Sequence, residues 1–216
     1  IYKGIVRYYA QRDGVTPVFL PEPPERFQAK LNNDGTISLS WTAPPHNGGS
    51  TSSPLGDAAT GYRVYQSTHG KAFADGQDVT GTSLTISDGL QPGTTYYFRV
   101  AATNAGGESF PTETLAVRYQ AADTNPILVV SGYDRLDEDL GPLQSGMHRH
   151  FLDRMNTFDY VISAAEDIAR YGQGFDSCAN EAVEQGGVNL GDYAAVVWLL
   201  GMESLEDKTL SSAEQS

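Results

Sequence analysis

Two acidic side chains directly follow apolar runs in the C-terminal part of the sequence. Asp134 comes after ILVVSGY, and Glu203 comes after AAVVWLLGM. Such runs suit strands that are buried on both faces of a parallel sheet, and ligands gather at the carboxyl ends of parallel strands. Asp134 and Glu203 are therefore candidate binding residues in one cleft. The acids at 137–139 could add a hard-cation site or form a solvated loop, and their spacing does not match an EF-hand.

The sequence offers no recognisable catalytic or metal-binding constellation. Its single cysteine, Cys178, lies in FDSCANEA, which we predict to begin a helix. Nucleophiles of hydrolase folds instead stand on a sharp turn after a strand, so we interpret Cys178 as a buried structural thiol. His148 and His150 are two residues apart, and no third zinc ligand follows at a recognisable spacing. We therefore expect no catalytic residue, no metal and no cofactor in this chain.

Aromatic and basic side chains alternate on two segments that we expect to be neighbouring strands. Tyr97 and Arg99 point away from the apolar side of one segment, as Arg63 and Tyr65 do on the other. Tyr65 and Tyr97 on an exposed sheet could stack on a sugar ring. The alternative is that these residues form cross-strand pairs that only stabilise the sheet.

The elements that carry these tyrosines follow a period of two. Apolar residues alternate with polar ones in the segments FQAKL, TISLSW, GYRVYQS, SLTIS, YYFRVAA and LAVRY. Gly, Pro and Asn turns separate these segments, which lie within about 100 residues, as is typical of a β-sandwich. We expect this sandwich to span residues 22–120.

The N-terminal residues differ from the sandwich. Ile1, Ile5 and Tyr9 are four residues apart, which predicts a helix over residues 1–12. The segment TPVFLPEPPERF follows, and its closely spaced prolines forbid a regular helix and stiffen an extended linker. We therefore assign residues 1–21 to a terminal helix and a proline-rich linker.

The C-terminal residues 126–216 have the composition of an α/β unit. Buried strands are predicted at ILVVSG and YAAVVWLLG, with helices at about 147–171 and 177–185. This order predicts an open parallel sheet, but two strands cannot finish its edges. We therefore expect an incomplete α/β domain, completed by other domains or chains or by self-association.

Charge divides the chain in the same way. Residues 1–120 carry 9 basic and 10 acidic side chains, whereas residues 121–216 carry 5 basic and 17 acidic ones. The excess of acidic side chains in residues 121–216 repels phosphate backbones and anionic membranes, which argues against nucleic-acid binding. No apolar stretch is long enough for a membrane span. The start lacks Met and a signal peptide, so we expect the sequence to be a piece of a longer protein.

The segment around 22–120 resembles the fibronectin type III family. The resemblance lies in Trp41, in GYRVY, and in LQPGTTYYFRVAATNAGGES. It implies that Tyr96 forms the tyrosine corner of the sandwich and that Trp41 and Leu90 belong to its core. The fold class expected for the chain is thus multi-domain: an all-β fibronectin type III sandwich plus a partial α/β domain.

Two further resemblances suggest a setting for the sandwich. Residues 126–216, with ILVVSGYDR, NTFDYV, FDSCANEAV and VVWLLGMES, resemble the amidotransferase-like α/β region of bacterial xanthan lyase-like and golvesin-domain proteins. The opening IYKGIVRYYA resembles the last helix of zinc-dependent N-acetylmuramoyl-L-alanine amidases, whose zinc ligands lie upstream of that helix.

These resemblances imply a secreted, periplasmic or cell-surface bacterial protein that acts at the cell wall or on polysaccharide. We expect this chain to be its non-catalytic spacer or binding segment, with polysaccharide or peptidoglycan as possible partners. The alternative is part of a hydrolase or lyase whose catalytic residues lie outside this chain.

Overall fold

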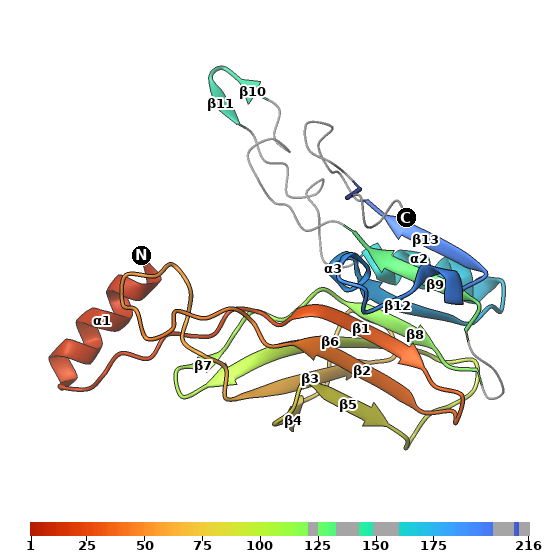
Figure 1. Ribbon diagram of the computed structural model, residues 1–216, viewed down its shortest axis with the longest axis horizontal. Helices are drawn as coiled ribbons and strands as arrows, with labels where there is room; N and C mark the ends of the chain where they lie inside the picture. The colour runs from red at the N-terminus through yellow and green to blue at the C-terminus, as the bar shows by residue number, and fades with distance from the viewer. Residues whose placement is uncertain (121–124, 133–142, 149–159, 201–209, 212–216) are drawn as a thin grey trace.

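The computed structural model describes residues 1–120, 125–132, 143–148, 160–200 and 210–211 (Figure 1). The helices are α1 (Tyr2–Asp13), α2 (Tyr160–Arg170), α3 (Asn180–Glu184) and the 3-10 turn η2 (Leu190–Asp192). The strands are β1 (Glu25–Leu31), β2 (Ile37–Thr42), β3 (Gly61–Ser67), β4 (Gln77–Val79), β5 (Ser83–Ile86), β6 (Thr95–Asn104), β7 (Gly107–Glu108), β8 (Leu115–Arg118), β9 (Ile127–Ser131), β10 (Leu143–Gln144), β11 (Met147–His148), β12 (Phe175–Ala179) and β13 (Ala195–Leu199).

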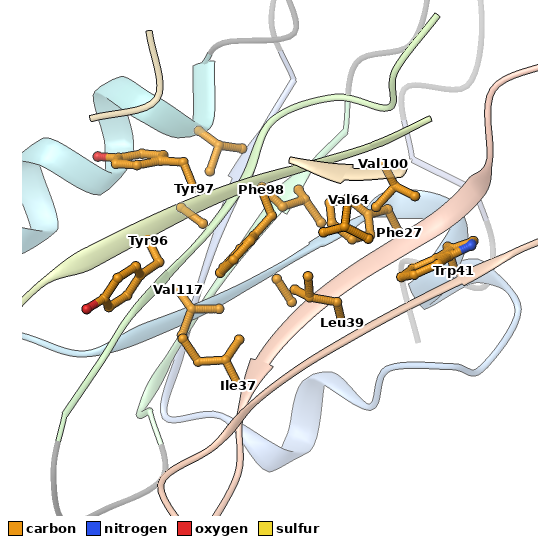
Figure 2. Packing of buried hydrophobic residues seen from close by; sticks show 14 of the residues in the cluster. Phe27, Ile37, Leu39, Trp41, Val64, Tyr96, Tyr97, Phe98, Val100 and Val117 are labelled. Carbon is orange, nitrogen blue, oxygen red and sulfur yellow. The ribbon is translucent and has the colours of Figure 1, made fainter. Parts of the chain in front are cut away.

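Two sheets pack face to face to form the sandwich. The first sheet has the strand order β13-β9-β12-β1-β2-β5, and the second has the order β4-β3-β6-β7, with β8 also paired to β6. Alternate side chains of each strand point into the space between the sheets, as the period of two predicts. Figure 2 shows this core. Its fully buried members include Phe27, Ile37, Leu39, Phe98, Val100 and Val117.

Aromatic residues fix both ends of this core. Trp41 is buried and packs edge to face on Tyr62, with ring centroids 5.4 Å apart. The hydroxyl of Tyr96 accepts a hydrogen bond from the Gln91 amide at 2.7 Å and donates one to the Gly89 carbonyl at 3.1 Å. Tyr96 thus ties the start of β6 to the loop before it, which is the arrangement of a tyrosine corner.

The C-terminal strands continue the first sheet of the sandwich. β12 pairs antiparallel with β1, placing Gln28 opposite Cys178 and Ala29 opposite Ser177. β9 then pairs parallel with both β12 and β13. The sandwich itself therefore covers one edge of the parallel strands.

Two expectations for this region were wrong. We predicted a helix at 177–185, but residues 177–179 lie in β12, and α3 covers only Asn180–Glu184. Within the described residues the parallel set consequently has three strands, β13, β9 and β12, where two were expected. The cause is that β12 buries polar residues, which hid its strand character: Asp176 and Ser177 are both buried and bonded to other strands.

Helices cover both faces of β9. Val129 of β9 packs in the sandwich core with Val161 of α2, whereas its neighbours Leu128 and Val130 pack with Val183 of α3. Burial on both faces explains the continuous apolar run of β9. Of the helix predicted at 147–171, residues 160–170 form α2, residues 147–148 form β11, and residues 149–159 lie outside the described residues.

The N-terminal helix α1 lies beyond one end of the sandwich (Figure 1). Lys3 donates to the Ser53 carbonyl at 2.9 Å and also bonds the Leu55 carbonyl, and Arg7 bonds the Thr51 carbonyl. Both cations also stand over the ring of Phe19, at 4.9 and 5.3 Å from its centroid. These contacts attach α1 to the loop between β2 and β3.

Candidate functional site

The ends of the parallel strands were the first predicted site. Leu199 of β13 stands opposite Ser131 of β9, and the Gly132 amide donates to the Leu199 carbonyl at 2.8 Å. The chain therefore leaves both strands at the same edge of the sheet. Asp134 and Glu203, the two candidates that follow these strands, lie outside the described residues.

The predicted pair of exposed tyrosines is not formed. Tyr97 is only 3% exposed and packs in a buried cluster with Ile162 of α2. Figure 2 shows its ring on the opposite side of β6 from Phe98, toward α2. Burial is also the main reason that the pKa of Tyr97 is raised, and Glu166 of α2 adds to it. Tyr97 therefore has no face to offer a sugar, because α2 covers the outer surface of β6.

Tyr65 takes part in a polar network on the part of this surface that α2 leaves open. Its hydroxyl bonds the Glu108 carboxylate, which also pairs with Arg63 at 3.4 Å. Arg63 pairs in turn with Asp78 at 2.8 Å. Desolvation, followed by Glu108, raises the pKa of Tyr65. These contacts are cross-strand pairs of the kind that stabilise a sheet.

A polar hollow lies where the sandwich meets the C-terminal strands, and we call it the seam pocket. Its volume is about 550 Å³. It is lined by Lys30, Leu31, Asn32, Asn33, Asp34, Asn125, Asp176, Asp192 and Tyr193. The end of β1 and the following turn contribute one wall, and the residues before β9, within β12 and before β13 contribute the other.

Asp176 holds the two walls of the seam pocket together. Its Oδ1 accepts hydrogen bonds from the Leu31 amide at 2.9 Å and from Asn125 Nδ2 at 2.7 Å. Its Oδ2 accepts one from the Tyr193 hydroxyl at 3.1 Å. A single carboxylate thus joins β1 to the segments that precede β9 and β13.

Burial dominates the electrostatics of this carboxylate. Asp176 is 2% exposed, and desolvation raises its pKa although the hydrogen bonds from Leu31, Asn125 and Tyr193 oppose the rise. The pKa of Tyr193 is raised as well, first by its own burial and then by the nearby Asp176 charge. A buried carboxylate with a raised pKa is a common feature of functional sites, although structural networks also produce it.

No sequence signal distinguishes Asp176 as a site residue. Asp and Ser are favoured at the start of a helix, so the acid within FDSCA agrees with a helix start and becomes meaningful only once the segment is placed in a strand. The partners of Asp176 are as much as 145 residues away, so no local pattern marks them.

Other chemistry is limited in the described part of the chain. Cys178 is a free, buried thiol whose pKa is raised by desolvation, so at neutral pH it is protonated and a poor nucleophile. The described residues contain no group of three His, Cys, Asp or Glu side chains that could hold a metal ion. None of the helices within those residues combines the length and apolar character that crossing a bilayer requires.

Comparison with known proteins identifies the sandwich. Residues 22–118 match the model of the fibronectin type III domain, so this segment is a fibronectin type III domain. Over 107 residues the chain is 37% identical to chitinase A1 of Niallia circulans. That match covers 49% of this chain and 13% of the chitinase, so the chain spans a small part of this relative.

Solved structures with similar segments include two from animal proteins. The twitchin kinase region of C. elegans is 30% identical, with 47% of this chain and 17% of that chain covered and a TM-score of 0.37. The sixth fibronectin type III domain of human fibronectin type III domain containing protein 3 is 24% identical, with 48% and 89% covered and a TM-score of 0.39.

Proposed function

We propose that this chain is a non-catalytic segment of a polysaccharide-acting protein. In this proposal the fibronectin type III domain and the C-terminal strands form one rigid unit, which spaces and orients the parts on either side of it. The observation that carries the proposal is the pairing of β12 with β1, which makes one continuous sheet of both parts.

The contacts across this junction favour a rigid connection over a flexible tether. Phe175 of β12 is fully buried in the same cluster as the sandwich core. The Ser177 hydroxyl accepts a hydrogen bond from the Ala116 amide at 2.8 Å and donates one to the Ala116 carbonyl at 2.7 Å. These bonds satisfy the free edge of β8, so separating the two parts would expose both apolar surface and backbone groups.

The similarity to chitinase A1 supports polysaccharide as the material on which the parent protein acts. A secreted, periplasmic or cell-surface setting in a bacterium, with peptidoglycan as another candidate partner, belongs to the same proposal. The acidic C-terminal part agrees with a neutral or cationic partner rather than with nucleic acid.

The test measures motion and activity on the same purified chain. Amide ¹⁵N relaxation should give one rotational correlation time for residues 25–118 and 160–199. That value should persist after insertion of about six Gly/Ser residues following Gln120, because the coupling runs through β1 and β12 and not through the connecting segment. Two separate correlation times would contradict the rigid unit.

A second candidate function is part of a hydrolase or lyase. It is favoured by the adjacent ends of β9 and β13, since enzymes with parallel sheets place their sites at such ends. Peptidoglycan, with and without added zinc, and xanthan are the substrates to assay. The non-catalytic proposal expects no release of fragments, and release by this chain alone would support the enzyme instead.

A further inference from the structure

The seam pocket is lined almost entirely by groups that form hydrogen bonds. Of its lining residues only Leu31 is apolar, and the others supply amide, carboxyl, ammonium and phenol groups. Its volume of about 550 Å³ falls in the range of roughly 300–1,000 Å³ that small-molecule sites have. The pocket is therefore large enough for an organic ligand and too polar for a mainly apolar one.

The charges of the lining narrow the class of ligand. Three carboxyl groups, Asp34, Asp176 and Asp192, face a single ammonium group, Lys30. This excess disfavours phosphate, sulfate and other anions. A metal ion is not favoured either. The three carboxyl groups line the same pocket, but neither they nor any other His, Cys, Asp or Glu side chains among the described residues form a group that could hold a metal ion.

The arrangement of donors and acceptors suits hydroxyl groups. Asp176 Oδ2 takes one hydrogen bond, from Tyr193, and a carboxylate oxygen can accept a second. Lys30 and Asn33 are exposed at the rim, so their side chains can donate to a ligand oxygen without breaking a bond of the fold. Tyr193 is half-buried and adds aromatic surface, against which the apolar face of a sugar ring can pack.

We infer that the seam pocket binds a neutral saccharide, held by Asp176 and Tyr193 at its base and by Lys30 and Asn33 at its rim. This inference rests on the proposed role in polysaccharide recognition, and it names the surface that would perform it. A sugar bound here touches both the sandwich and the C-terminal strands, so its binding also depends on the junction between them.

The test is NMR titration of the whole chain with three tetrasaccharides: chitotetraose with all amines acetylated, its cationic deacetylated form, and anionic tetragalacturonic acid. The acetylated sugar should give saturable shifts at the amides of Leu31, Asn33 and Tyr193. The double variant Lys30→Ala/Asn33→Ala should bind it about tenfold more weakly, which corresponds to the loss of two ordinary hydrogen bonds. Cosedimentation of the chain with insoluble chitin and peptidoglycan is measured in parallel.

The matched control is Lys71→Ala/Gln91→Ala, which removes an exposed lysine and an exposed amide away from the pocket and should leave affinity unchanged. Shifts that map elsewhere, or equal affinity in the two double variants, would overturn the inference while cosedimentation still supports the proposed function. Preference for the cationic or the anionic sugar would also overturn it. Loss of cosedimentation together with the absence of any shift would count against both.

Discussion

Replacing Asp176 is the sharpest test of how the sandwich and the C-terminal strands are joined. In Asp176→Asn the side-chain oxygen can still accept from Leu31 and Asn125, and the new amide nitrogen can donate to the Tyr193 oxygen. In Asp176→Ala all of these acceptors disappear. The first change removes the charge and keeps the connections, whereas the second removes both.

The geometry sets the size of the alanine effect. The Leu31 amide and one Asn125 amide hydrogen lose their acceptor in a buried place, while Asn125 keeps its bond to the Phe175 carbonyl at 2.8 Å. Each buried donor left unsatisfied costs about 1–3 kcal/mol. Water entering from the seam pocket can reach Tyr193 and lowers the total. We therefore expect Asp176→Ala to lower the free energy of unfolding by about 2–4 kcal/mol at pH 7.

The asparagine variant should instead differ from the wild type in its pH dependence. Because the pKa of Asp176 in the folded protein lies above its ordinary value of 3.8, the folded state binds this proton more tightly than the unfolded chain. The resulting stability is fully present below about pH 3.8 and is lost as the pH rises through the raised pKa. Asp176→Asn cannot titrate, so its stability relative to wild type should increase from pH 4 to pH 7.

Urea denaturation at several pH values, followed by tryptophan fluorescence, measures both effects. Asp34→Asn is the control with the opposite sign, because hydrogen bonds from Thr36 lower the pKa of the exposed Asp34. Its loss relative to wild type should therefore shrink as the pH falls. Equal destabilisation by Asn and Ala at position 176, with no change across pH, would refute the account of a buried carboxylate that joins the two parts.

The remaining predictions concern the core and the edges. Trp41→Ala should cost about 3–5 kcal/mol and Tyr96→Phe about 1–3 kcal/mol in urea melts, by loss of packing and of the corner hydrogen bonds respectively; neutral effects would contradict these roles. Cys178 should react with a thiol reagent only as fast as the protein unfolds, and rapid labelling in native buffer would disprove its burial. A chain that ends at Gln120 should be less stable than the full chain, because removal of β12 exposes the β1 edge; equal melting midpoints would argue against the shared core. Light scattering should detect association through β13, whose Val196 is 37% exposed and which pairs with one strand among the described residues; a strictly monomeric chain would show that this edge needs no cover.

Much of the sandwich could be predicted because its strands are half-buried. In a half-buried strand, apolar and polar residues alternate, because one set of side chains faces the core and the other faces solvent. The sequence therefore shows which face of the strand is buried. Strands β1, β2 and β5 and most of β3 follow this rule, whereas β6 and β8 also bury residues on their outer faces, such as Tyr97 and Ala116. The short strands β4 and β7 contain three and two residues, which is too short for any period to be recognised.

The candidate site could not be predicted in the same way, because its residues are defined by contacts between distant segments. Tyr97 alternates along β6 as an exposed residue would, yet α2 covers it from a position more than 60 residues later in the chain. The alternation of a strand reports which side faces the sandwich core. It does not report whether a later helix packs on the other side.

The case of β12 shows how one missed strand changes the interpretation of the whole chain. With FDSCA taken as a helix start, the C-terminal part has two strands and no contact with the sandwich, so its open edges require another chain. With FDSCA as a strand, Asp176 and Ser177 become the groups that bond β1 and β8. The edge strand β1 of the fibronectin type III domain then pairs with β12, the edge of the parallel strands. Polar residues that are buried where two segments join interrupt the apolar pattern by which a core strand is recognised. A pattern of hydrophobicity therefore does not predict such junctions.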